Sequence, residues 1–124
     1  MGILRFEDII SWQKARQLTL DIYKTFEGQK DFEFKNQIQR ASVSIMNNIA
    51  EGFERKTEKE FTYFLYMAKG STAEVRSMLY LAKDLNKISD EDFKRLYQLT
   101  MQISQLISGF IRHINEKENT KKTK

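Results

Sequence analysis

The chain has 124 residues, a net charge of +4, 40% hydrophobic and 31% charged residues, a balance typical of a single globular domain. It contains no cysteine, which excludes a disulfide framework and thiolate metal sites. No apolar segment approaches the roughly 20 residues that span a membrane, and the acidic residues near the N-terminus do not fit a signal peptide. We therefore expect a cytoplasmic protein without membrane association.

The first predicted helix covers residues 9–26. Asp8 is its candidate N-cap, because a carboxylate accepts hydrogen bonds from first-turn amides, and Gly28 is the candidate stop, in a left-handed conformation. Side chains at spacings of three and four share one face, as expected of an amphipathic helix. They are Trp12, Ala15, Thr19, Ile22 and Phe26.

The second predicted helix starts after Asp31, another N-cap candidate, and ends near Gly52. It carries two apolar stripes, whereas one stripe suffices to dock a helix on one neighbour. The pattern therefore predicts an inner or interfacial helix. The first stripe is Ile38, Ala41, Ile45 and Ile49, and the second is Val43, Met46, Ala50 and Phe53.

The third predicted helix covers residues 58–85 and begins with a capping box from Thr57 to Glu60. Its face opposite the core combines tyrosines with a smooth strip of small residues, where another backbone could come close. With the second stripe of residues 32–53, this face predicts a homo-oligomer; the alternative is a monomer with a few exposed tyrosines. The predicted interface residues are Val43, Met46, Phe53, Tyr63, Tyr66, Gly70 and Ala73.

The fourth predicted helix follows a connection at residues 86–89, with Ser89 as its cap. From Phe93 to Ile114 its apolar residues keep a heptad spacing, which matches near-parallel helix packing. Four helices, three short connections and no strand signal predict an all-α fold, an up-down-up-down antiparallel four-helix bundle over residues 1–116. Residues 117–124 are expected to form a basic, disordered tail.

No catalytic or metal-binding pattern is present in the sequence. His113 is the single histidine, so a histidine-based triad or zinc site lacks partners. Glycine-rich phosphate loops are absent, and the Glu-x-x-His pairs of di-iron bundles are absent as well. We therefore expect a protein that is not an enzyme and has no metal or cofactor.

Lys69, Arg76 and Lys83 form the first of two basic groups. Their seven-residue spacing places them on one line of the third helix, about 10 Å apart. Tyr66 and Tyr80 lie close to this line, and basic residues interleaved with aromatic ones suit an RNA surface. The alternative is a solvated helix edge whose aliphatic stems cover the core.

Arg40 and Arg55 belong to the second group, the polar line of the second helix, together with Asn47 and Asn48. Their side chains can donate hydrogen bonds to phosphate or to neighbouring backbone. The alternatives for this group are a solvated face or a network at a subunit contact.

Several runs of residues resemble a bacterial four-helix-bundle family, first recognised as products of intervening sequences in large-subunit ribosomal RNA genes and loosely labelled ribosomal proteins. The runs are Trp12–Ala15, Gln39–Ser42, Ser44–Gly52, Glu60–Phe61 and Phe64–Glu74. One departure is the first connection, which usually carries proline and here reads Gly28-Gln29-Lys30-Asp31. The resemblance implies a homo-oligomeric ring, a pentamer. It also implies similarity to the accessory protein of diversity-generating retroelements, a basic pentamer that partners a reverse transcriptase and nucleic acid.

The leading hypothesis is a non-enzymatic, oligomeric binding module associated with RNA or with a nucleoprotein. The alternative is a protein-interaction scaffold, such as an accessory subunit for a reverse transcriptase, in which the basic charge is incidental.

Overall fold

The computed structural model describes residues 2–122, and side chains for residues 2–119. A short 3₁₀-helix, η1 (Phe6–Asp8), precedes four α-helices: α1 (Ile10–Thr25), α2 (Phe32–Phe53), α3 (Glu58–Asp84) and α4 (Asp90–Lys122). The part of the chain that is described contains no strand, so the predicted all-α class is confirmed. Every helix in it is too short or too polar to span a lipid bilayer.

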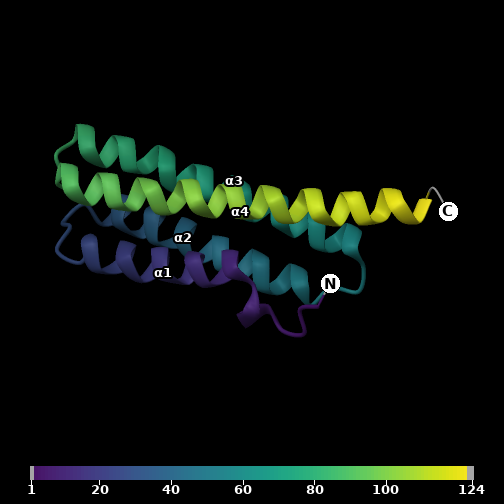
Figure 1. Cartoon of the computed structure of the whole chain (residues 1–124). Coiled ribbons are helices and arrows are strands. Elements are labelled where there is room, and N and C mark those ends of the chain that lie inside the picture. The colour runs from purple at the N-terminus through teal and green to yellow at the C-terminus, as the bar shows by residue number, and fades with distance from the viewer. Residues whose placement is uncertain (1, 123–124) are drawn as a thin grey trace.

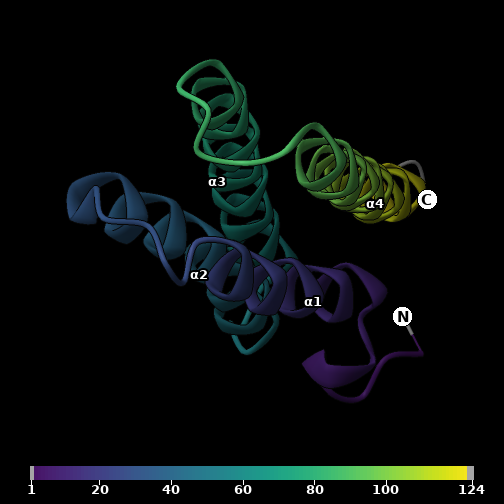
Figure 2. The same ribbon diagram turned by 90° about the vertical axis from the view of Figure 1, so that its left-hand side faces the viewer.

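The helices are arranged as an antiparallel bundle (Figure 1). α1 and α3 each pack against both α2 and α4, whereas within residues 2–122 the diagonal helices bring no Cα atoms within 8 Å of each other. Figure 2 looks onto the end of the bundle that carries the α1–α2 and α3–α4 connections. The predicted up-down-up-down topology is therefore confirmed.

The core is built from the stripes that the sequence predicts. Ile45 of α2 and Ile103 of α4 are fully buried, as is Leu65 of α3. The first stripe of α2 is buried throughout, while Met46 and Phe53 of the second stripe pack only against the edge of the core. The heptad of α4 also faces inward. Its period therefore identified the buried face correctly.

Three of the four predicted N-caps are confirmed. The backbone N–H of Phe34 donates to Asp31 Oδ1 at 3.2 Å, and the N–H groups of Glu60 and Asp92 donate to Thr57 Oγ1 and Ser89 Oγ, both at 3.1 Å. These bonds satisfy amides that have no partner inside the helix. The sequence signals for the starts of α2, α3 and α4 were therefore reliable.

The prediction that Asp8 caps α1 is wrong. Asp8 ends η1, and Ile9 takes the N-cap position without a side-chain cap. Asp8 instead lies 3.6 Å from Arg5. The 3₁₀ turn shifts the start of α1 beyond the reach of that carboxylate.

The prediction of a left-handed Gly28 is also wrong, because no glycine in the described chain has a positive φ. The end of α1 is instead closed by a tighter, 3₁₀-type turn, in which the N–H of Glu27 donates to the carbonyl of Lys24. The left-handed residue of this bundle is Asn86, with φ of 56°. The N–H of Asn86 donates to the carbonyl of Lys83 at 3.0 Å, and that of Lys87 to Ala82 at 2.8 Å. This is the Schellman motif that closes α3.

Gly52 lies inside α2 and is buried against α3. A Cβ atom at this position would come within 2.6 Å of Phe64 Cβ and 3.0 Å of Phe61 Cδ1. Glycine is therefore required for the close approach of α2 to α3.

α4 continues to Lys122. The predicted end of the bundle at residue 116 is therefore not a helix boundary. The last turns of α4 extend past the α2–α3 connection (Figure 1). Residues 123 and 124, which complete the predicted tail, lie outside the described residues.

Hydroxyl groups link neighbouring helices inside the bundle. Thr19 Oγ1 of α1 donates to the carbonyl of Ser42 on α2 at 3.1 Å. The hydroxyls of Ser44 on α2 and Ser71 on α3 are 2.9 Å apart. Asn48 Nδ2 donates to the Ser44 carbonyl at 2.8 Å and extends this group along α2.

Candidate nucleic-acid interface

The predicted basic line lies along the edge of α3 that faces α4. Lys69 shares a hollow of about 350 Å³ with Arg112 of α4, and the ammonium of Lys83 lies 4.7 Å from the ring centroid of Phe93 on α4. Arg76 lies between them on the same line. We call the outer surface between Lys69–Lys83 of α3 and Phe93–Asn115 of α4 the α3–α4 groove; the hollow at Lys69 and Arg112 lies at one end of it.

Aromatic side chains fill the end of the α3–α4 groove near the connection. Tyr80 of α3 makes edge contacts with Phe93 and Tyr97 of α4, at centroid distances of 5.2 and 5.9 Å. Phe93 and Tyr97 are stacked at 5.7 Å. Hydrogen bonding to Tyr97 and partial desolvation raise the pKa of Tyr80, while nearby Arg76 acts in the opposite direction. Arg76 is therefore close to the exposed phenol.

The cations of this groove are poorly neutralised. Neither Lys69 nor Arg76 forms an ion pair with any residue whose side chain is described. Between residues 93 and 115, α4 contains no aspartate or glutamate, and between 61 and 83, α3 contains one, Glu74. Glu116 lines the far end of the groove, in the hollow with Lys69. Arg76, in the middle of the groove, therefore has no carboxylate partner among the described side chains.

Sequence reasoning missed the contribution of α4 to this surface. Arg112, Phe93 and Tyr97 were assigned to no site, because helical spacing within one helix does not show which neighbour it faces. The absence of aspartate and glutamate over residues 93–115 was the sequence signal that could have indicated the contribution of α4 to this surface.

Arg40 and Arg55, the other predicted RNA-binding residues, lie elsewhere: Arg40 lines a hollow between α2 and α3, and Arg55 is in the α2–α3 connection. Arg55 donates to Glu51 at 2.8 Å and lies 4.7 Å from the ring centroid of Phe64. Arg40 shares its hollow with Glu33 and Glu74. The structure therefore does not bring these arginines together with Lys69, Arg76 and Lys83, and both have acidic neighbours.

The predicted interface residues also fall on two surfaces. Tyr63, Tyr66, Gly70 and Ala73 are exposed on the outer face of α3, and a Cβ atom at Gly70 would meet nothing within 4 Å. The members from α2 are half-buried, and Met46 and Phe53 pack against the bundle's own core. These members are Val43, Met46 and Phe53.

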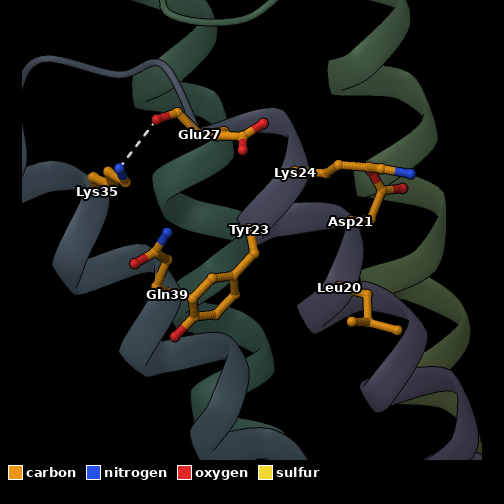
Figure 3. A pocket seen from close by; sticks show the side chains of 7 residues that line it. All are labelled: Leu20, Asp21, Tyr23, Lys24, Glu27, Lys35 and Gln39. Carbon is orange, nitrogen blue, oxygen red and sulfur yellow. Dashed lines mark hydrogen bonds between the residues drawn. The ribbon is translucent and has the colours of Figure 1, made fainter.

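The groove between α1 and α2 provides a contrast (Figure 3). It encloses about 720 Å³. The ring of Tyr23 extends toward Gln39, and Lys35 Nζ donates to the carbonyl of Glu27 at 3.1 Å. Asp21 points away toward α4, where Arg95 binds it. Two of the four charged residues that line this groove, Asp21 and Lys35, are therefore engaged within the bundle.

His113 is exposed and lines a mostly apolar hollow with Ile10 and Phe110. No group of three histidine, aspartate or glutamate side chains within the described residues could hold a metal ion.

The model of a family described as 23S rRNA-intervening sequence protein matches residues 7–109. The fold is similar to a crystal structure from Bacteroides thetaiotaomicron VPI-5482, described as a protein of unknown function from the S23 ribosomal protein family, with a TM-score of 0.78. The two chains are 24% identical, and the match covers 82% of this chain and 98% of the other. At that identity the likeness shows the fold alone. No curated protein matches the chain.

Proposed function

The chain belongs to the 23S rRNA-intervening sequence protein family, and from that premise we propose that it is a non-enzymatic, cytoplasmic, oligomeric binding module for RNA. The α3–α4 groove is its RNA-binding surface. The observation that carries the proposal is the combination, in one groove, of cations without ion pairs and an exposed tyrosine, along a stretch of α4 that lacks acidic residues. RNA offers the matching chemistry, negative phosphates and flat bases.

Oligomerisation strengthens this proposal, because one chain offers few phosphate contacts. The outer face of α3 exposes apolar side chains around the strip at Gly70, and such a face is typical of protein interfaces. They are Tyr63, Tyr66, Met67, Leu81 and Leu85. A closed homo-oligomer, which we propose to be a pentamer, would repeat the α3–α4 groove and bind RNA through several weak contacts at once.

Salt-dependent RNA binding tests the function. Fluorescence anisotropy with a labelled RNA should show binding that weakens steeply with salt, because each phosphate contact releases counterions. Changing Lys69, Arg76 and Lys83 together to glutamine should weaken binding and reduce the salt slope. The matched control changes Lys14, Lys24 and Lys30 to glutamine, which removes the same charge from the α1 side of the bundle.

The comparison of the two triple variants decides the role of the groove. Equal weakening would mean that net charge alone attracts RNA, and the groove would lose its assigned role. Circular dichroism and light scattering on both variants establish that the fold and the oligomer are retained.

A protein-interaction scaffold is the second candidate function, and the exposed apolar face of α3 favours it. In that case the partner would be a protein, such as a reverse transcriptase, and the basic charge would be incidental. Absence of RNA binding by the parent protein at low salt would favour this candidate over the first.

A further inference from the structure

We propose that the α3–α4 groove binds single-stranded rather than duplex RNA, with the exposed ring of Tyr80 stacking on an unpaired base while Arg76 and Lys83 hold the flanking phosphates. This inference rests on the proposed function and specifies the class of RNA.

Tyr80 has the properties of a stacking platform. Its side chain is 50% exposed although it sits in an aromatic cluster. Edge contacts with Phe93 and Tyr97 support the ring from α4. A ring that is already fixed loses little conformational freedom when a base stacks on it. Base–aromatic stacking of this kind tolerates every base, because each has a flat π-face.

Cations lie on both sides of Tyr80 along α3. Arg76 is one turn earlier, and its charge acts on the Tyr80 phenol. Lys83 is about one turn later, and its ammonium is held 4.7 Å from the centroid of Phe93. A nucleotide whose base stacks on Tyr80 therefore has a positive group available for the phosphate on either side.

The chemistry favours a single strand over a duplex. In a duplex, the faces of the bases are stacked on one another, so a protein reaches mainly phosphates, 2′-hydroxyls and base edges. A duplex would use the cations of this surface and leave Tyr80 without a role. In a single strand, unstacked bases can turn toward an aromatic ring.

The experiment compares a labelled 12-nucleotide RNA without secondary structure and a duplex of the same length, using the full chain. The single strand should bind more tightly. Tyr80→Leu should weaken single-strand binding by about five- to 150-fold and leave the salt slope unchanged, since no phosphate contact is lost. Tyr80→Phe keeps the ring and should bind like the parent. Arg76→Gln should instead reduce the salt slope by about 0.7, the value for one phosphate on a single strand.

Tyr23→Leu is the matched control, because Tyr23 is a comparably exposed tyrosine on the α1–α2 face, and it should bind like the parent. Ultraviolet cross-linking of the single strand to the unaltered protein gives a readout that does not depend on a variant folding. A cross-link should form at Tyr80, and cross-links confined to other peptides would overturn the inference. If the parent binds duplex as tightly as single strand and Tyr80→Leu binds like the parent, stacking is refuted while RNA binding stands. If the parent binds neither RNA at low salt, the proposed function itself falls.

Discussion

Arg95 on α4 binds Asp21 on α1 through two hydrogen bonds of 2.9 Å, from Nε to Oδ2 and from Nη2 to Oδ1. The two residues are 74 positions apart in sequence. Arg95 also donates to Asp92 at 2.7 Å, so its guanidinium is held from both sides. Among the residues with described side chains, this bidentate pair is the ionic link between α1 and α4, and its geometry favours the charged forms of both partners.

Acid should weaken this link. The hydrogen bonds from Arg95 hold the pKa of Asp21 below its ordinary value of 3.8, although partial burial acts in the opposite direction. A carboxyl with a depressed pKa stabilises the fold at higher pH, and that contribution is lost as the pH falls through the folded-state pKa. Asp21→Asn should cost roughly 1 kcal/mol of unfolding free energy near neutral pH, with the difference from the parent shrinking below about pH 4.

Urea denaturation at several pH values measures this effect. Asp8→Asn is the control, because Asp8 is mostly exposed and lies 3.6 Å from its partner Arg5. Its stability should stay close to that of the parent. A pH-independent difference between Asp21→Asn and the parent would contradict an ionic role for Asp21.

Core truncation should be costly at the centre of the bundle. Ile103 is fully buried on α4, so Ile103→Ala should destabilise by roughly 2–5 kcal/mol through lost burial and a residual cavity. Ile45→Ala on α2 should lower the free energy of unfolding by a similar amount. Ile10 is 58% exposed, and Ile10→Ala should cost less than about 1 kcal/mol. Equilibrium unfolding of the three variants checks the ranking, which a cost below half a kilocalorie at Ile103 would refute.

Gly52 and Gly70 should respond to alanine with opposite signs. At Gly52, the new Cβ would meet Phe64 Cβ at 2.6 Å, and relieving that contact must move α2 away from α3. Gly52→Ala should therefore destabilise by about 1–3 kcal/mol. In the single chain the space at Gly70 is open, so at a dilution where the chain is monomeric Gly70→Ala should raise the intrinsic stability of α3 by about 0.5–1 kcal/mol. Thermal unfolding distinguishes the two variants by their Tm. A change of Tm in the same direction in both variants would contradict the packing described for α2 and α3.

The assembly proposal predicts a particle several times heavier than the 14.8 kDa chain. Light scattering at micromolar concentration measures this mass. Ala73→Arg places a long charged side chain in the small-residue strip of α3 and should lower the mass without loss of helix. Gln98→Arg makes a similar change at an exposed position of α4 and should leave the mass unchanged. A monomeric parent would leave the exposed face of α3 without its proposed partner.

The fold could be predicted from the sequence because its signals are local. Asp31, Thr57 and Ser89 cap helices within three residues, and the apolar period of α4 marks its buried face without reference to other helices. The errors at Asp8 and Gly28 arose where a 3₁₀ turn and a tightened helix end replaced the expected cap conformations. Several local solutions can satisfy the same terminal groups, and composition does not select among them.

The candidate site was only partly predictable for a different reason. The line of Lys69, Arg76 and Lys83 follows from helical spacing, but its pairing with Tyr97 and Arg112 depends on how α3 and α4 are rotated against each other. The separation of Arg40 and Arg55 from this line depends on how α2 packs against α3. Such relationships join residues that are distant in sequence, and they appear only when the helices are placed in space.

The hydroxyl contacts between helices have a consequence for the uniqueness of the bundle. Apolar stripes alone permit two helices to slide by one turn, about 5.4 Å, and still bury similar side chains. The contact from Thr19 to the Ser42 carbonyl and the pair formed by Ser44 and Ser71 exist in one alignment. In a slipped alignment the contact between the partly buried hydroxyls of Ser44 and Ser71 would be lost, and Thr19 would keep only its 2.9 Å bond to the Ala15 carbonyl of its own helix. These contacts therefore favour the native alignment of α1, α2 and α3 over alignments shifted by one turn.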